Sequence, residues 1–136
     1  MSAVHPHHVG LTVAALDAAR DFYAAAFGFE QLLEFELPGG VRGAMLRTPA
    51  GAGVELFEAP GSAGGLAGAT PPQALLVRGL GHVAFEVDDL EESFAAALAE
   101  GASCVWEPRR SPEPGRRMAF VHDLDGNLVE LISQPE

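Results

Sequence analysis

The sequence predicts an α+β fold built from two βαβββ modules, and three observations lead to this prediction. Residues 8–16 match residues 82–90 at an offset of 74 positions. Both stretches open with His-Val and then alternate small or polar residues with bulky apolar ones, as half-buried strands do. A helical pattern follows each stretch. Because a repeat of this kind reflects two copies of one structural unit, we expect two modules with the same order of elements.

The repeat continues to the end of the chain and marks one more strand in each module. Residues 54–57 (Val-Glu-Leu-Phe) match residues 129–132 (Val-Glu-Leu-Ile) at an offset of 75 positions. Each module therefore has a histidine at its first strand and a glutamate at its last. These four residues are His8, Glu55, His82 and Glu130.

The first module covers about residues 5–59. Asp17 is the expected N-cap of a short helix over residues 18–27, and Gly28 suits the left-handed residue that ends a helix. The expected strands are residues 7–14, 30–37, 42–48 and 54–58.

The linker covers about residues 60–79. It is rich in glycine, proline and alanine, a composition typical of a flexible connection. A short ordered piece over residues 73–77 is the one element expected within it.

The second module covers about residues 80–135 and repeats the same order. Asp89 is the expected helix N-cap, Glu92 completes a capping-box-like pair with it, and Gly101 ends the helix. A loop with three prolines is expected over residues 107–115, and a tight turn over residues 123–127. The expected strands are residues 81–87, 102–106, 117–122 and 128–133.

The length of 136 residues suits one compact domain, so we expect both modules to share a single domain over residues 1–136.

The formal net charge is −11 and every cation is an arginine, which argues against nucleic-acid binding. No apolar run approaches the length of a membrane span, and no signal-peptide pattern is present, so we expect a soluble cytoplasmic protein. The single cysteine, Cys104, excludes an internal disulfide and is expected to be buried in a strand.

The four repeated polar residues have two readings. A single strand histidine is commonly a hydrogen-bonded structural residue, and the face that carries Glu55 and Glu130 is then simply exposed to solvent. That reading also exposes Phe57 and Ile132, which share the face, and each buried apolar side chain contributes about 1.5–3 kcal/mol. The second reading is a metal site, because two imidazoles and two carboxylates suit a divalent ion such as Zn, Ni, Co, Mn or Fe.

A resemblance to a known family follows from several motifs. The chain resembles the vicinal oxygen chelate superfamily, which includes glyoxalase I, methylmalonyl-CoA epimerase, extradiol dioxygenases and bleomycin-binding proteins. The motifs are Asp21-Phe22-Tyr23, Phe27-Gly28-Phe29, Gly81-His82-Val83-Ala84-Phe85 and the ending over residues 123–131. The resemblance covers nearly the whole chain and implies paired βαβββ modules that form a cupped mixed sheet around a metal, usually in a homodimer.

The resemblance also implies a ligand set and a chemistry. His8, Glu55, His82 and Glu130 match the ligand pattern of the bacterial glyoxalase I form, whereas the epimerases usually have glutamine at the position of Glu55. Both branches remove a proton next to a carbonyl, and the metal stabilises the enediolate or enolate. The resemblance thus implies a divalent-metal-dependent lyase or isomerase, with Glu130 as the leading base and Glu55 as its partner.

Two other functions stay open at this point. One is a non-catalytic protein that binds and sequesters a small molecule or drug. The other is an extradiol-type ring-cleaving dioxygenase, although those enzymes use three ligands and lack one at the position of Glu55.

The candidate substrate contacts are aromatic residues and a cluster of arginines. Phe57 and Trp106 are candidate pocket walls, with Met45 and Phe120, and core packing is the competing role for each. Four arginines gather over residues 109–117: Arg109, Arg110, Arg116 and Arg117. Pairing with Glu107 and Glu113 explains them in one reading. In the other, Arg116 or Arg117 binds a carboxylate or phosphate of an anionic substrate, such as a coenzyme A thioester or a glutathione-like thiol adduct.

Overall fold

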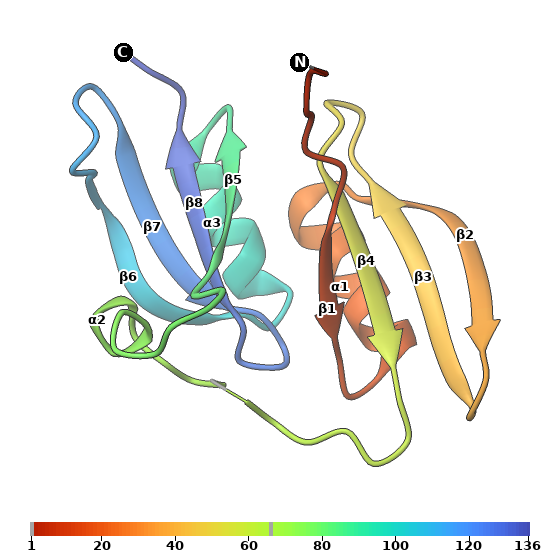
Figure 1. Cartoon of the computed structure of the whole chain (residues 1–136). Helices are drawn as coiled ribbons and strands as arrows, with labels where there is room; N and C mark the ends of the chain where they lie inside the picture. The colour runs from red at the N-terminus through yellow and green to blue at the C-terminus, as the bar shows by residue number, and fades with distance from the viewer. Residues whose placement is uncertain (1, 66) are drawn as a thin grey trace. The chain divides into compact units, whose positions relative to one another are not determined.

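The computed structural model describes residues 2–65 and 67–136, and the chain divides into two compact units (Figure 1). One unit comprises residues up to Ala24 and Gly28–Ser62, and the other comprises Ala25–Phe27 and Ala63–Glu136. The division between residues 62 and 63 falls inside the predicted linker. Each unit is described by itself below.

The first unit contains a four-stranded sheet in the order β1-β4-β3-β2. Strands β1 and β4 pair in parallel, and the other two pairings are antiparallel. Figure 1 shows α1 on one face of this sheet, behind β1 and β4. The elements are β1 (Val9–Thr12), α1 (Leu16–Phe27), β2 (Glu30–Leu37), β3 (Val41–Arg47) and β4 (Gly53–Glu58).

The second unit repeats this topology in the order β5-β8-β7-β6, with β5 and β8 parallel. Helix α3 packs against β6, β7 and β8. The βαβββ order therefore occurs twice, and the predicted α+β fold class is confirmed. The elements are α2 (Pro71–Ala74), β5 (Val83–Val87), α3 (Leu90–Ala99), β6 (Ser103–Arg110), β7 (Arg117–His122) and β8 (Leu128–Ser133).

Helix α1 begins earlier than predicted and has a different cap. Its N-cap is Ala15, which makes no side-chain capping bond, and Asp17 lies in the first turn. The predicted N-cap role of Asp17 is therefore wrong. Instead, the carboxylate of Glu58 in β4 accepts a hydrogen bond from the backbone N–H of Leu16 at 2.9 Å. The other end follows the prediction, because Gly28 has a φ of 73° in the left-handed region.

Helix α3 has the local cap that the sequence predicts. The side chain of Asp89 accepts a hydrogen bond from the backbone N–H of Glu92 at 3.0 Å. The helix ends at Ala99, and Gly101 follows with a φ of 108°.

Strand β6 runs farther than predicted. Residues 107–110 were expected in a loop, but they belong to β6, and the loop is shorter. Proline is tolerated at position 108 because β6 is the edge strand of its sheet, and the pairing with β7 shifts register between Trp106 and Arg109. Arg109 and Arg110 therefore stand at the end of a strand and not in the loop.

The two faces of each sheet have the predicted character. In β4 Val54 and Leu56 are fully buried, whereas Glu55 between them points to the other face. In β8 Val129 and Leu131 are fully buried on either side of Glu130. The alternation that marked these strands thus separates an apolar core face, covered by a helix, from a face that carries the glutamates.

Helix α2 is the short ordered piece in the linker. It covers Pro71–Ala74, slightly before the predicted range, and Thr70 and Gln73 form a complete capping box at its start. The Nε2–H of His122 in β7 donates a hydrogen bond to the carbonyl oxygen of Ala69 at 2.7 Å, which ties the segment to the second unit.

The surface departs from expectation at Cys104. Its thiol is exposed, so the prediction of a buried cysteine is wrong. The reason is that β6 is an edge strand, and its pairing with β7 shifts register immediately after Cys104.

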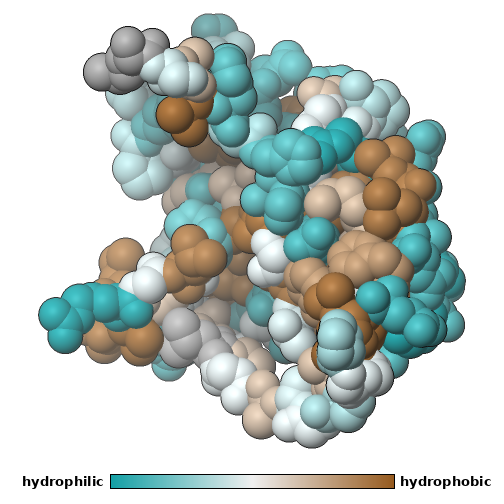
Figure 2. All heavy atoms as spheres, turned by 45° about the vertical axis from the view of Figure 1, so that its right-hand side comes forward, coloured by the Kyte–Doolittle hydropathy of each residue, from teal (hydrophilic) through white to brown (hydrophobic). Residues whose placement is uncertain are grey.

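Figure 2 shows apolar side chains reaching the surface among polar ones, and those with large exposed areas include Leu32, Leu33 and Leu37 of β2. No helix among the described residues is long and apolar enough to cross a membrane.

Candidate metal centre

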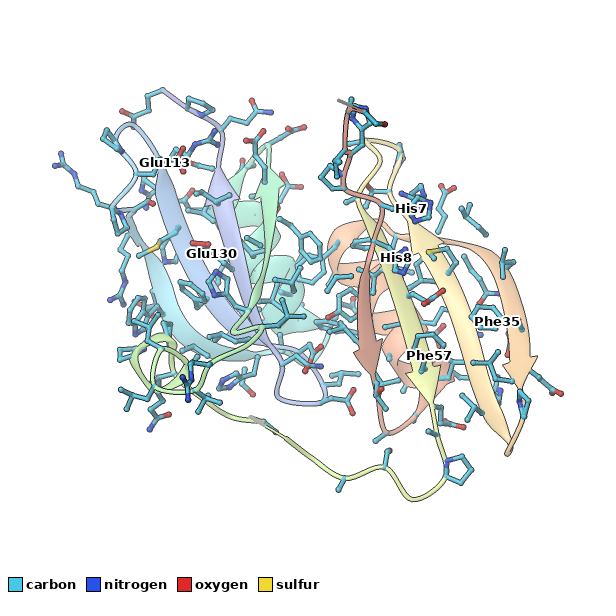
Figure 3. All side chains as sticks on the ribbon, viewed as in Figure 1. His7, His8, Phe35, Phe57, Glu113 and Glu130 are labelled. Atoms are coloured by element: carbon cyan, nitrogen blue, oxygen red, sulfur yellow. The ribbon has the colours of Figure 1, made fainter. Side chains whose placement is uncertain are left out.

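His8 and Glu55 form a pair on the helix-free face of the first sheet. The Nε2 atom of His8 lies 3.4 Å from Oε1 of Glu55. His8 immediately precedes β1, and Glu55 stands in β4 between Gly10 and Met45 of the neighbouring strands. Figure 3 shows His8 and Phe57 on the sheet face opposite α1.

His7 and Arg47 of β3 fix the position of His8. The guanidinium of Arg47 donates hydrogen bonds to the backbone carbonyl oxygens of His7 and Gly51, both at 3.0 Å. The Nδ1 atoms of His7 and His8 lie 2.7 Å apart, so one ring donates to the other. Gly53 is required here, since a Cβ atom at that position meets the carbonyl oxygen of His7. Arg47 is a positioning residue that the sequence analysis missed, because its partner lies forty residues away in the chain.

Aromatic rings line the rest of this face. Phe57 in β4 meets Phe35 in β2 edge-to-face, with ring centroids 5.9 Å apart. Gly43 lies between them in β3, where a Cβ atom meets the Phe35 ring. Phe57 therefore stands on the same face as Glu55 in a partly buried aromatic wall, and its role as a pocket wall stays a prediction.

His82 and Glu130 form the equivalent pair in the second unit. The Nε2 atom of His82 lies 3.5 Å from Oε1 of Glu130. Glu130 stands in β8 between Ala84 of β5 and Phe120 of β7. Only 15% of its side chain is exposed, against 22% for Glu55, so Glu130 is the more enclosed of the two carboxylates.

An aromatic row supports this second pair. The ring of His82 meets Phe120 edge-to-face at 5.4 Å between centroids, and Phe120 meets Trp106 in the same way at 5.5 Å. The guanidinium of Arg109 lies over the Trp106 ring, 4.7 Å from its centroid. Phe120 is buried with Met118 and Leu128, so it serves the core as well as the site.

The two pairs occupy equivalent positions in the two units. Gly10 pairs with Glu55 and Ala84 pairs with Glu130 in the parallel ladders. These residues are related by the same offsets of 74 and 75 positions that the sequence repeat shows. The strand register therefore places one His–Glu pair at the same point of each sheet.

The donor atoms of each pair are compatible with a shared metal ion. Two ligands at about 2.0–2.2 Å from one ion lie at most about 4.4 Å apart. The separations of 3.4 Å and 3.5 Å meet this condition. Among the described residues no group of three or more His, Cys, Asp and Glu side chains gathers at one point. Each unit by itself thus presents two donors, and binding of one ion by all four residues stays a prediction.

Arg116 and Arg117 have partners within the second unit. Arg116 binds Glu86, Glu113 and the carbonyl oxygen of Ser133, at 2.6, 3.1 and 2.9 Å. The hydrogen bond to Glu86 is the main reason that the pKa of Arg116 is raised above its ordinary value. Arg117 forms an ion pair with Glu91. Both arginines therefore have carboxylate partners within the unit, of which Glu113 was expected, and a contact of either arginine with a substrate stays a prediction.

Comparison with known proteins settles the family. The model of the Glyoxalase/Bleomycin resistance protein/Dioxygenase superfamily matches residues 5–131. The chain belongs to this superfamily. Lactoylglutathione lyase of Schizosaccharomyces pombe is 29% identical over all of this chain, which spans 49% of that enzyme's length.

Solved structures of superfamily members share the fold. A glyoxalase family protein from Enterococcus faecalis is 28% identical with a TM-score of 0.75, over 94% of this chain and 96% of its own. Glyoxalase I from Zea mays is 25% identical with a TM-score of 0.75, over 96% of this chain and 44% of its own. A glyoxalase family protein from Bacillus cereus has a TM-score of 0.82 at 22% identity, over 100% of this chain and 97% of its own, and this likeness concerns the fold alone.

This superfamily member also has a cavity that the sequence did not reveal. It has a volume of about 450 Å³ and lies in the second unit, between the α2 segment and the side chains of His82 and Trp106. The composition of residues 60–79 predicts a linker and no site. The signal for this cavity was the cluster of large apolar residues at positions 75–77, in a stretch made mostly of glycine, alanine and proline.

Proposed function

We propose that this protein is a divalent-metal-dependent lyase or isomerase of the glyoxalase I type, which moves a proton next to a carbonyl. The observation that carries the proposal is the placement of an equivalent His–Glu pair in each unit, at the same register of the two sheets. Membership of the superfamily and the similarity to a lactoylglutathione lyase support it. We further propose a homodimer that acts on an anionic thioester or thiol adduct.

In this proposal His8, Glu55, His82 and Glu130 together hold one ion, either Zn, Ni, Co, Mn or Fe. The bound ion would supply Lewis-acid polarisation of the substrate oxygens. The two histidines provide neutral nitrogen donors. Arg47 fixes the backbone at His7, and Phe120 supports the ring of His82, so both imidazoles are held in place by other groups.

Proton transfer is assigned to the carboxylates. A C–H bond next to the substrate carbonyl breaks, its proton passes to an oxygen of Glu130, and the carboxyl group then returns it to the former carbonyl carbon. The hydroxyl proton of the first carbon passes to the former carbonyl oxygen, so that the two carbons exchange their hydroxyl and carbonyl groups. The sequence of steps is a net isomerisation, so it needs no oxidant or reductant. Glu130 is the leading base because it is the more enclosed of the two carboxylates, with 15% of its side chain exposed against 22% for Glu55. Glu55 is its partner, and Phe57, Trp106, Arg116 and Arg117 are the candidate substrate contacts.

The test is a glyoxalase assay with methylglyoxal and glutathione, combined with metal analysis of the purified protein. We expect Glu130→Gln to lower kcat by about 100-fold or more, because general acid–base catalysis contributes about 10² to 10⁴. Glu107→Gln is the matched control, since Glu107 is an exposed glutamate of β6 outside both pairs. A protein that holds no metal and turns over no substrate, but still binds small molecules, is instead the sequestering protein that the sequence left open.

A further inference from the structure

The cavity beside α2 combines an apolar lining with nearby guanidinium groups that have no carboxylate partner among the described residues. Its apolar walls include Pro71, Pro72, Ala74, Leu75, Val77 and Trp106. Small-molecule sites typically have volumes of about 300–1,000 Å³ and mostly apolar walls with a few polar groups. The volume of about 450 Å³ lies within this range.

Apolar residues are also left uncovered beside this cavity. Leu75 is 85% exposed and Leu80 is 86% exposed, although both are large apolar side chains. Leu75 is part of the cavity wall, so a ligand seated there removes apolar surface from water.

Arg78 and Arg109 give the cavity its charge. Arg78 lines it directly, and Arg109 lies over Trp106, which forms part of the wall. Among the residues that the structure describes, Arg78 forms no hydrogen bond or ion pair, and Arg109 donates only to the carbonyl oxygen of Glu107. In contrast, the ion-paired arginines of this acidic chain include Arg20, Arg42, Arg116 and Arg117.

No carboxylate among the described residues neutralises Arg78 or Arg109. Arg78 lines the cavity, and Arg109, which donates to the carbonyl oxygen of Glu107, lies over the Trp106 wall, so both guanidinium groups can bind an anion there. We propose that the cavity binds a small aromatic carboxylate, with the ring against Trp106 and the prolines and the carboxylate bound by Arg78 and Arg109. His82 also lines the cavity, which places such a ligand beside the His82–Glu130 pair. The proposal goes beyond the proposed function by naming a ligand class for this cavity, and it rests on that function only in placing the ligand beside the proposed metal centre.

The experiment measures binding rather than turnover, so that the two proposals fail separately. Trp106 is the only tryptophan of the chain, so its fluorescence reports on the cavity. The probes are 3-phenylpropionate and its neutral amide, titrated into the protein as purified and again after chelation. We expect the acid to bind about tenfold tighter than the amide, in line with a hydrogen bond to a charged group, and to weaken as salt rises.

The variants Arg78→Gln and Arg109→Gln should each weaken binding of the acid severalfold and leave binding of the amide nearly unchanged. Arg110→Gln is the matched control, because Arg110 also has no ion pair among the described residues but neither lines the cavity nor lies over Trp106. Unfolding temperatures of all variants verify that the fold is intact. Equal affinity for acid and amide, or an unchanged affinity in the double Arg78→Gln/Arg109→Gln variant, would overturn the proposal. Retained binding with no lyase activity refutes the proposed function alone, and lyase activity without probe binding refutes only the cavity.

Discussion

Asp17 shows how one residue can be placed correctly on a helix and still have a different role from the expected one. Its carboxylate accepts hydrogen bonds from Arg42 at 3.0 Å and from Arg20 at 3.2 Å. The hydrogen bond from Arg42 is the largest of the effects that lower the pKa of Asp17. A lowered pKa in the folded state means that the carboxylate stabilises the fold above its ordinary pKa of 3.8, and that this contribution is lost as the pH falls through the folded value.

We therefore expect Asp17→Asn to lower the unfolding temperature slightly near neutral pH, because exposed ion pairs are weak. The difference from the unchanged protein should shrink as the pH falls below the ordinary aspartate pKa. Thermal unfolding followed by circular dichroism over a pH series measures this. Asp21→Asn is a suitable comparison, since Asp21 contacts Arg20 but not Arg42. A difference that grows toward acid pH would contradict the assignment.

Residues whose partners are local could be predicted from the sequence, and residues whose partners are distant could not. Gly28 and Asp89 act within their own helix ends, so the local pattern was sufficient. Arg47 holds His7, and His122 holds Ala69, across 40 and 53 positions of the chain. Nothing in the neighbouring sequence distinguishes these two side chains from ordinary surface residues of a strand.

At the scale of elements, strand β4 organises the first unit on both of its faces. Glu55 points to the helix-free face, and Glu58 accepts the hydrogen bond from the first N–H of α1. A second carboxylate oxygen of Glu58 lies 3.9 Å from Arg42. The carboxylate thus takes the place of a local N-cap and also complements the positive end of the helix dipole.

We expect Glu58→Ala to destabilise the protein by about 1–2 kcal/mol, because α1 then begins without a capping acceptor. Glu58→Gln retains an acceptor atom and should cost less. Glu36→Ala is the matched control, since Glu36 is an exposed strand glutamate whose side chain forms no hydrogen bond among the described residues. Urea unfolding curves give the three values. Equal losses for Glu58→Ala and Glu36→Ala would show that the capping bond contributes nothing.

The sequence repeat predicted the order of the helices and strands better than the residues at which they begin and end. It gave the matching first and last strands of both modules, since identical alternation implies identical pairing. It missed the extension of β6 over residues 107–110, because proline and arginine are poor strand signals and the register shift beside Trp106 is a tertiary effect. It also missed the cavity beside the α2 segment, whose composition is that of a linker.

At the scale of the whole molecule, the decisive question is whether the two His–Glu pairs act together. Two ligands from one pair bind a divalent ion weakly, whereas four ligands with the expected chemistry bind it tightly. If both pairs serve one ion, the chain binds one equivalent. If each unit binds its own ion, the chain binds two.

We expect one equivalent per chain, measured by isothermal titration and by metal analysis after gel filtration. The variant His8→Ala/Glu55→Ala and the variant His82→Ala/Glu130→Ala should each lose tight binding completely, because either change leaves only two ligands. Metal at about 100 times the dissociation constant should stabilise the unchanged protein by about 2.7 kcal/mol, and neither variant should respond. Glu107→Ala, which alters an exposed glutamate outside both pairs, should behave like the unchanged protein. Two equivalents in the unchanged protein and one in each variant would instead mean that the two units bind metal independently, and the proposed four-ligand centre would be refuted.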